Sequence, residues 1–351
     1  MMAVNNLETI SINDLDLDKY LLFDVRSPKE YEEYHLPGAI NLSIFTNEQR
    51  AEIGTLYKQE SKEAAIERGL EVVGPKLPAL FQKIKTEKKK NPDKKVVIYC
   101  ARGGLRSKSI AQTMNMIGIQ CLQLEGGIRS YRKQIESFFE RFIKTPRKII
   151  VLEGHTGTMK TKILEQLQSE GYPVINLEEM AGHKGSIFGR IGEQPSSQKK
   201  FESNLFERLK ELETSQSLII ESESKRIGRV VVPDFLLEGK YSGTRIHVEI
   251  PFHLRVHFIC NVYKPLLHKD EIVEAVNKLS KRIPLPVMED LQHRLQNQNY
   301  EKVVSLLLEN YYDPKYEFAE QKYESECVKL YGDSFEEIYI KVKEQIKRLI
   351  L

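Results

Sequence analysis

The sequence predicts an α/β protein with two domains in series, at residues 1–140 and 147–351, the second ending in a helical part. Short runs rich in β-branched residues alternate with amphipathic segments, which is typical of parallel sheets covered by helices. Two of these runs end in a glycine-rich loop that leads directly into a helix. A length of 351 residues also suits two domains better than one.

The first domain is expected to alternate strands and helices from residue 20 onward. Residues 20–27 ("YLLFDVRS") and 94–100 ("KKVVIYC") are apolar, β-rich runs. Turn chemistry at Pro37-Gly38 separates a short helix from another strand within residues 28–43, and a further strand is expected at 120–127. Helices are expected at residues 62–90 (interrupted around Gly74 and Pro78), at 107–118, and from 128 toward a linker near Thr145-Pro146.

Cys100 is the first candidate for chemistry, because it ends a strand just before a helix N-terminus. Open α/β sheets bind ligands at this edge, and the helix dipole with backbone N–H groups lowers a thiol's pKa and favours anions. Gly103 and Gly104 let the loop curl so that N–H groups point inward, and Arg102 and Arg106 add positive charge. The cradle suits a persulfide or selenide anion on Cys100, or a phosphate beside it. The simpler interpretation is a half-buried cysteine in a tight turn.

Two chemistries share this loop. The stretch "FDVRSPKEYEEYHLPGAINL", followed by "VVIYCARGG", resembles the rhodanese domain, a sulfurtransferase fold, over roughly residues 10–135. The spacing of Cys100, Arg106 and Ser107 is also that of cysteine-dependent phosphatases, some of which use the same scaffold. A phosphatase needs an acid to protonate the leaving group, and the sequence identifies none. Three polar residues are expected to hold loops together rather than to react: Asp24, Arg26 and His35.

The second domain begins with a strand at residues 148–154 and a helix at 160–171. Further strands are expected at 215–225 and 245–260, and the chain is expected to be helical from Lys269 onward, most clearly at 303–321 and 335–350. Packing or hydrogen bonding is the expected role of three histidines that lack metal-ligand spacing with a third ligand: His247, His253 and His257.

The stretch "GHTGTMKT" (residues 154–161) is nearly the phosphate-binding P-loop G-x-x-x-x-G-K-[ST]. Loop N–H groups would wrap a diphosphate, Lys160 would neutralise it, and Thr161 would hold a magnesium ion. Met159 departs from the pattern, because a glycine is expected before the lysine, and a side chain there crowds the phosphates or strains the backbone. The candidate diphosphate-binding residues are Gly154, Thr156, Gly157, Thr158, Lys160 and Thr161. A plain strand-to-helix turn is the alternative.

An acidic partner for this loop is expected at the end of another buried strand. Glu221 and Glu223 follow "SLII" and are candidates to orient metal-bound water, with a solvated strand end as the equal alternative. Residues 176–202 form a glycine-rich, basic stretch whose default interpretation is a surface loop. Within it, the candidates to contact the phosphate of a nucleic acid are His183, Lys184 and Arg190, with Phe188 as a base-stacking candidate.

The two halves together resemble the bacterial tRNA 2-selenouridine synthases. Pieces carrying the resemblance run through nearly all of the chain: "DVRSPKEY", "QRAEIGTLYKQ", "YCARGGLRS", "LEGGIRSYR", "LEGHTGTMKT", "LEEMAGHKGSIFG" and "ESESKRIGRVVVP". The departure at Met159 persists, because that family usually reads Gly-Lys-Thr there.

The resemblance implies a tRNA-modifying transferase. Its substrate would be wobble 2-thiouridine (position 34) in tRNAs for Lys, Glu and Gln. The sulfur would receive a geranyl group from geranyl diphosphate, and selenium from selenophosphate would then replace S-geranyl to give 2-selenouridine. Cys100 would take part in the selenium step, and the P-loop would hold the diphosphate with or without Mg²⁺.

Two other classes of function remain open. One is a rhodanese-fold cysteine phosphatase or sulfurtransferase, or a kinase, with a nucleotide-binding second domain. The other is a non-catalytic RNA-binding protein. A net charge of +3 requires any tRNA to meet local basic patches. Four scattered cysteines without CxxC pairs, with no secretory signal or membrane-length apolar run, predict a cytoplasmic protein that has no disulfide framework.

Overall fold

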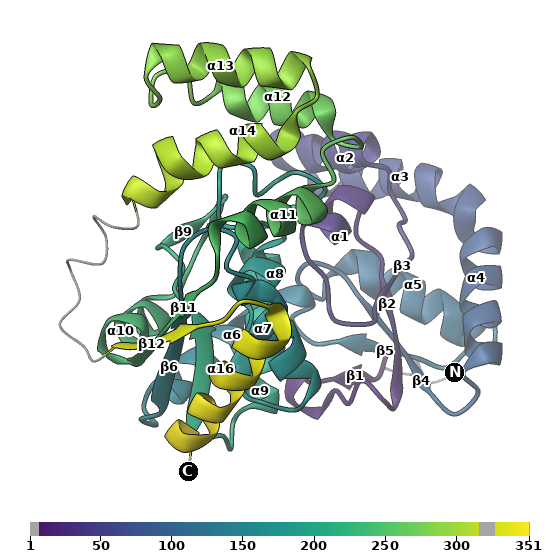
Figure 1. Ribbon diagram of the computed structural model, residues 1–351. Helices are drawn as coiled ribbons and strands as arrows, with labels where there is room; N and C mark the ends of the chain where they lie inside the picture. Colours follow the sequence, from purple (N-terminus) through teal and green to yellow (C-terminus); the bar gives the residue numbers. More distant parts are fainter. Residues whose placement is uncertain (1–6, 316–326, 351) are drawn as a thin grey trace, which may run out of the picture. The chain divides into compact units, whose positions relative to one another are not determined.

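The computed structural model describes residues 7–315 and 327–350. The chain forms two compact units, Met1–Arg141 and Phe142–Leu351. Each unit is built around a five-stranded parallel sheet, as the alternation of strands and helices predicts (Figure 1). The fold class expected from the sequence is therefore confirmed.

The sheet of the first unit has the strand order β1-β5-β4-β2-β3. Its strands are β1 (Thr9–Ile10), β2 (Tyr20–Asp24), β3 (Ile40–Asn41), β4 (Lys95–Tyr99) and β5 (Cys121–Leu124). Phe23 and Ile98 pair across β2 and β4 and face a core formed with helices α3 to α5. Leu22 and Val97, which point to the opposite face, are equally buried, so both faces of the sheet are covered.

Helices of this unit follow the sequence expectations closely. The interruption near Gly74 is a short 3₁₀ turn between α3 and α4, with Pro78 in the first turn of α4. The helical segments are η1 (Ile12–Asp14), α1 (Pro28–Glu33), α2 (Asn47–Gln59), α3 (Lys62–Val73), η2 (Gly74–Lys76), α4 (Leu77–Lys90), α5 (Leu105–Met116) and α6 (Ile128–Phe142).

The sheet of the second unit has the order β12-β11-β6-β8-β7, and a small hairpin joins β9 to β10. The strands are β6 (Lys148–Glu153), β7 (Val174–Ile175), β8 (Ser217–Glu221), β9 (Arg226–Ile227), β10 (Val230–Val231), β11 (Thr244–Glu249) and β12 (Cys327–Tyr331). One face of the sheet packs against α7 and α16 in a single apolar cluster. On β6, Ile149 lies against Gly239 of α10.

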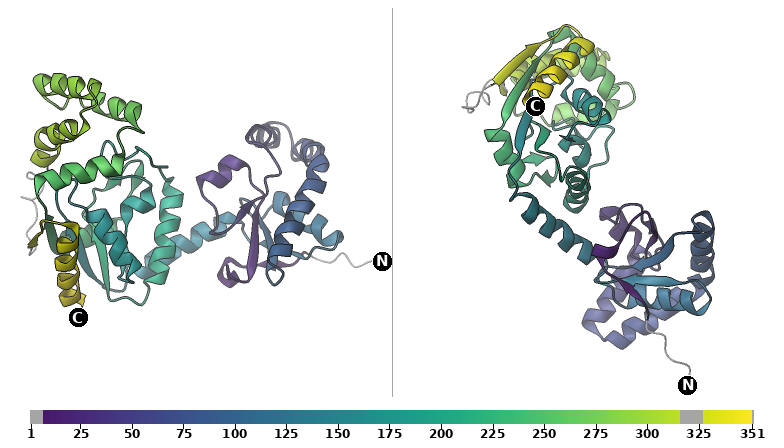
Figure 2. Two further views of the ribbon diagram at one scale, coloured as in Figure 1. Left: turned by 45° about the vertical axis from the view of Figure 1, so that its right-hand side comes forward. Right: turned by 90° about the horizontal axis from the view of Figure 1, so that it is seen from below.

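A separate helical group completes this unit. Helices α12 to α14 share their own apolar core and lie beyond α11, away from the sheet (Figures 1 and 2). The helical segments are α7 (Lys160–Ser169), α8 (Leu177–Ala181), α9 (Gln198–Glu211), α10 (Asp234–Ser242), α11 (Phe252–Tyr263), α12 (Lys269–Asn277), α13 (Leu285–Gln296), α14 (Tyr300–Leu307), η3 (Leu308–Tyr312) and α16 (Phe335–Ile350).

Two sequence expectations are wrong here. The strand expected over 245–260 ends at Glu249, and α11 follows, because Pro251 caps a helix that buries Arg255, Val256 and Ile259 on one side. The helical stretch expected from Lys269 onward is broken by β12, which joins the sheet edge beside β11. Part of the helix expected at 303–321 lies outside the described residues.

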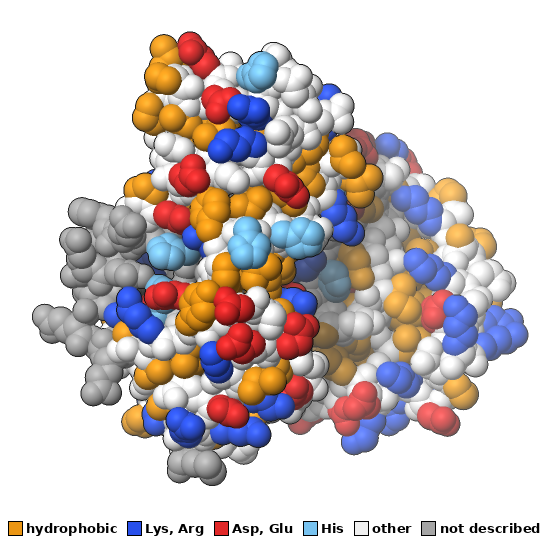
Figure 3. Space-filling view, viewed as in Figure 1, with side chains coloured by type: hydrophobic (Ala, Val, Ile, Leu, Met, Phe, Trp, Pro, Cys, Tyr) orange, Lys and Arg blue, Asp and Glu red, His pale blue; other side chains and the backbone are white. Residues whose placement is uncertain are grey.

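On the face drawn in Figure 3, basic and acidic side chains of the described residues are interspersed rather than gathered into separate patches. Among the described residues, no helix combines the length and apolar character needed to cross a membrane.

Candidate active sites

Cys100 lies directly after β4, with only 3% of its surface exposed. The loop behind it turns at Gly103, whose φ is +65°, and α5 begins at Leu105 with Gly104 as its N-cap. The Ser107 hydroxyl donates to Cys100 Sγ over 3.2 Å. Burial alone would raise the pKa of the Cys100 thiol. Hydrogen bonds from the Ser107 hydroxyl and the Arg102 backbone, together with the charge of Arg106, lower it by more than burial raises it, so the net pKa is below its usual value.

Gln123 on β5 fixes the hydroxyl that serves this sulfur. Its Nε2 donates to Ser107 Oγ over 2.7 Å and to the Gly103 carbonyl over 2.9 Å. Because Ser107 Oγ accepts this hydrogen bond, its own hydrogen can point toward Cys100. The spacing of Cys100, Arg106 and Ser107 in the sequence points to Ser107, whereas Gln123 has no such signal, because its role depends on the pairing of β4 with β5.

The two candidate arginines differ in placement. Arg102 is exposed, whereas Arg106 is partly buried and donates to Glu30 over 2.8 Å. Arg50 approaches the same carboxylate at 3.4 Å. Burial raises the pKa of Glu30, but the hydrogen bond and charge of Arg106 outweigh it and leave the pKa lowered. Glu30 therefore stays ionised and does not supply the proton that a phosphatase needs.

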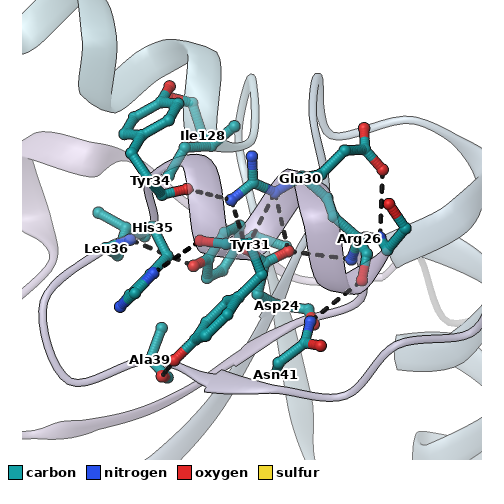
Figure 4. Close-up of polar contacts among 12 residues, drawn as sticks. Asp24, Arg26, Glu30, Tyr31, Tyr34, His35, Leu36, Ala39, Asn41 and Ile128 are labelled. Carbon is teal, nitrogen blue, oxygen red and sulfur yellow. Dashed lines mark hydrogen bonds and ion pairs between the residues drawn. The ribbon is translucent and has the colours of Figure 1, made fainter. Parts of the chain in front are cut away.

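The residues expected to hold loops together do so (Figure 4). Arg26 donates to both carboxylate oxygens of buried Asp24 and to the Tyr34 carbonyl, the last over 2.7 Å. His35 Nδ1 lies 2.8 Å from the Tyr31 carbonyl, and the two rings stack. These contacts agree with structural roles for Asp24, Arg26 and His35.

A second glycine pair closes over the cysteine loop. Gly127 has a φ of +58°, and a Cβ there would lie 2.2 Å from the Cys100 carbonyl oxygen. The Ile128 N–H donates to that carbonyl over 2.9 Å. The sequence analysis did not single out this glycine, although "EGG" was a visible signal for close backbone approach.

The P-loop of the second unit has the expected strand–loop–helix setting between β6 and α7. Gly154 and Gly157 have positive φ values of 146° and 86°. Lys160 Nζ donates to the carbonyls of Gly154 and His155 over 2.7 and 3.0 Å. Burial lowers the pKa of Lys160, opposed by the charges of neighbouring glutamates. The Lys160 ammonium group thus lies within the loop that would hold the diphosphate, whose charge it would neutralise.

Met159 shows why glycine is expected at its position. Its φ of 62° and ψ of 19° lie in the left-handed region that glycine adopts at little cost. The Met159 side chain packs against the apolar cluster beneath α7 and α16. The departure therefore strains the backbone, and the side chain is accommodated by the core.

Three carboxylates gather beside this loop. Oxygen atoms of Glu178, Glu221 and Glu223 lie within 4.8 Å of one another. Thr161 Oγ1 donates to Glu178 Oε2 over 3.0 Å, and the Glu178 N–H donates to Glu221 Oε1 over 2.7 Å. Burial, followed by the charge of Glu223, raises the pKa of Glu178 to about 7. The pKa values of Glu221 and Glu223 are raised as well, primarily by burial.

This oxygen-rich set fits a hard divalent cation such as Mg²⁺, with the Thr161 hydroxyl as a neighbouring ligand. A cation would offset the cost of burying these carboxylates and relieve the repulsion between Glu178 and Glu223, which adds to the rise in the pKa of Glu178. Glu221 and Glu223 were expected here, whereas Glu178 was missed. Its only sequence signal was the acidic start of "LEEMAG" after a short apolar run.

The candidates for tRNA contact do not share one exposed surface. His183 is buried, with its ring close against Gly189 and Gly228. Lys184 pairs with Glu193, and Arg190 is exposed. Residues 176–202 are not simply a surface loop, because they contain α8 and bury Phe188. A role in tRNA contact stays a prediction, with Arg190 as its exposed member.

A buried polar cluster was also missed. Glu153, the last residue of β6, accepts from Arg245 over 2.6 and 2.9 Å, and His247 and Cys327 approach it at 3.3 and 3.5 Å. Burial raises the pKa of Glu153, but His247 and Arg245 lower it more, to about 2. Because Arg245 engages both carboxylate oxygens, the cluster fixes three strands together rather than offering a free metal site.

The two sites define a protein with a cysteine loop at a helix N-terminus in one unit and a P-loop with an acidic cluster in the other. The rhodanese-like domain model matches residues 11–134, and a model described as the tRNA 2-selenouridine synthase AAA domain matches residues 147–348. The chain therefore belongs to the tRNA 2-selenouridine synthase family.

Curated relatives with this name align over most of the chain. That of Nitrosomonas europaea is 33% identical over 80% of this chain and 73% of its own length. That of Shewanella sediminis is 29% identical over 93% of this chain and 95% of its own. That of Sulfurovum sp. is 30% identical over 92% of this chain and 94% of its own.

Proposed function

We propose that this protein converts wobble 2-thiouridine of tRNA to 2-selenouridine, in two steps on one chain. In the first step, the uridine sulfur attacks the first carbon of geranyl diphosphate, and diphosphate leaves. In the second step, the selenium atom of selenophosphate attacks C2 of the base and geranylthiolate leaves. Water then cleaves the selenium–phosphorus bond, so that phosphate is released and 2-selenouridine remains. Alkylation makes the second step feasible, because it converts the thione sulfur into a leaving group.

The observation that carries the proposal is the P-loop beside a cluster of three carboxylates, one buried and two partly buried, in a chain of this family. Lys160 and the loop N–H groups suit the oxygens of a diphosphate. A cation on Glu178, Glu221 and Glu223 would supply Lewis acidity when bound. Electrostatic stabilisation of departing diphosphate is what alkyl transfer requires.

Cys100 supports the second step. Its lowered pKa increases the fraction of thiolate at any given pH relative to an ordinary thiol. The N-terminus of α5 provides the N–H groups that bind an anion such as selenophosphate beside that sulfur. The phosphatase alternative is less well supported, because Arg106 pairs with Glu30.

Nucleoside mass spectrometry tests the proposal. The protein is incubated with tRNA carrying wobble 2-thiouridine and geranyl diphosphate, with and without selenophosphate. Lys160→Ala is expected to abolish geranylation, whereas Cys100→Ser is expected to stop at the geranylated nucleoside. Matched controls are exposed Lys162→Ala, two residues along the same helix, and Cys121→Ser, a buried cysteine on β5. An unchanged nucleoside in every reaction of the folded protein refutes the proposal.

A further inference from the structure

An apolar pocket lies beside the P-loop of the second unit. Its volume is about 530 Å³ when the space at its open, solvent-facing side is included. The P-loop contributes Thr156 to the lining, and the segment between α8 and α9 contributes Phe188. The other walls come from two helices, with Ile259 and Cys260 on α11 and Val304 and Leu307 on α14. No residue assigned above to diphosphate or cation binding forms the pocket except Thr156.

The pocket is continuous with the phosphate-binding loop. A Cβ on Gly157 would lie 2.8 Å from Ile259 Cδ1, so α11 packs directly on the loop. Arg255 Nε, also on α11, donates to the Thr156 carbonyl over 2.9 Å, and Asp313 holds the guanidinium in place. A ligand whose anionic group lies in the loop therefore has the pocket next to it.

The lining selects hydrocarbon over a nucleobase. Aliphatic and aromatic side chains form nearly all of it. The Ser186 hydroxyl and the Tyr263 hydroxyl, both on the lining, lie 3.2 Å apart and are hydrogen-bonded to each other. Burial raises the pKa of Cys260 to about 11, so this thiol is neutral. A base edge placed here would find few groups to replace its hydrogen bonds to water, the buried Tyr300 hydroxyl among them, whereas a hydrocarbon chain needs none.

We infer that this pocket holds the hydrocarbon chain of a prenyl diphosphate whose diphosphate lies in the P-loop. The inference rests on the proposed function and adds to it the place and the residues that recognise the chain. It also assigns a role to the helical group α12 to α14, since both α11 and α14 contribute side chains to the lining. Phe188, considered above as a stacking partner for a base, instead packs against the chain.

Ligand binding to the full protein tests this inference. The probes are inorganic diphosphate, dimethylallyl diphosphate, geranyl diphosphate and ATP, measured by titration calorimetry with Mg²⁺. Each buried methylene group adds apolar contact, so geranyl diphosphate is expected to bind the wild type roughly a hundredfold more tightly than inorganic diphosphate. Dimethylallyl diphosphate is expected to fall between them.

The discriminating variant is Val304→Phe, which fills the pocket from a partly buried wall position. We expect it to bind inorganic diphosphate like the wild type and to lose most of the preference for geranyl diphosphate. The matched control is Val273→Phe, on partly buried α12 surface outside the pocket, which is expected to keep the preference. A Val304→Phe protein that keeps the full preference overturns the inference and leaves the proposed function standing.

A second measurement does not depend on that variant folding. Cys260 lines the pocket, so its alkylation by a maleimide, followed by peptide mass spectrometry in a Cys100→Ser background, reports occupancy. Geranyl diphosphate is expected to protect Cys260, whereas inorganic diphosphate is expected to leave it reactive. Equal reactivity with a bound prenyl ligand overturns the inference. A wild type that binds ATP and shows no preference for geranyl over inorganic diphosphate contradicts the proposed function itself.

Discussion

Replacing Ser107 by alanine is expected to make Cys100 a weaker nucleophile at neutral pH. The Ser107 hydroxyl lies 3.2 Å from Cys100 Sγ and is itself held by Gln123. It is the leading favourable contribution to the lowered pKa of this thiol, ahead of the backbone N–H of Arg102 and the charge of Arg106. Removing the hydroxyl therefore raises the pKa of Cys100.

The size of the effect follows from the charge on the acceptor. A hydrogen bond to a charged group contributes about 1.5–3 kcal/mol, and 1.36 kcal/mol corresponds to one tenfold step in the protonation equilibrium. Below the pKa, the thiolate fraction of the Ser107→Ala variant should thus be roughly ten- to a hundredfold lower. Backbone N–H donors remain in the variant, which favours the lower end.

The assay is the rate of iodoacetamide alkylation of Cys100 as a function of pH, with peptide mass spectrometry to separate the four cysteines. The rate profile of Ser107→Ala should shift to higher pH. Gln123→Leu should shift it in the same direction by less, because the hydroxyl stays but is no longer oriented. Ser109→Ala, on the exposed side of the same helix, is the control. Identical profiles for wild type and Ser107→Ala refute this account of the thiol.

Three further predictions concern the second unit. Arg245→Leu removes the guanidinium from the buried Glu153 carboxylate and leaves it with the longer contacts of His247 and Cys327. This change should lower the free energy of unfolding in urea by about 3–5 kcal/mol, whereas loss of the surface Arg294–Asp290 pair through Arg294→Ala should cost about 0–1 kcal/mol. Glu178 has a pKa of about 7 against an ordinary 4.5, so between these pH values the native state binds more protons than the unfolded state. The free energy of unfolding in urea without divalent cations should therefore fall as pH rises through that window, and it should fall less in Glu178→Gln. Met159→Gly relieves a left-handed φ of 62° but loses core packing; inorganic diphosphate affinity, measured by calorimetry, should stay within about threefold, since the side chain points into the core.

Local patterns predicted most of the fold. The sequence predicts both glycine-rich loops because each stands between an apolar run and an amphipathic helix. The structure confirms the need for glycine there, for example at Gly103 and Gly157, which both have a positive φ. These are properties of short segments, so the sequence carries them directly.

Long-range contacts account for what was missed. The segment at β12 is half-exposed and short, and only its pairing with β11 makes it a strand. Residues 252–260 contain enough aromatic and β-branched side chains to indicate a strand, but Pro251 and the burial of one side produced α11. Glu178 meets Thr161 and Glu221 across the sheet edge, and no spacing in the sequence signals that meeting.

The position of β12 and α16 has a consequence for synthesis of the chain. All strands of the first unit are present once residue 124 has been made, so the cysteine loop can form while translation continues. The second unit cannot complete its apolar core until the last residues have been made, because Ile338, Val342 and Ile346 of α16 supply part of that core beneath the P-loop. A product that stops near residue 315 would carry a finished Cys100 site and a P-loop unit with exposed apolar surface, the state that chaperones and proteases recognise.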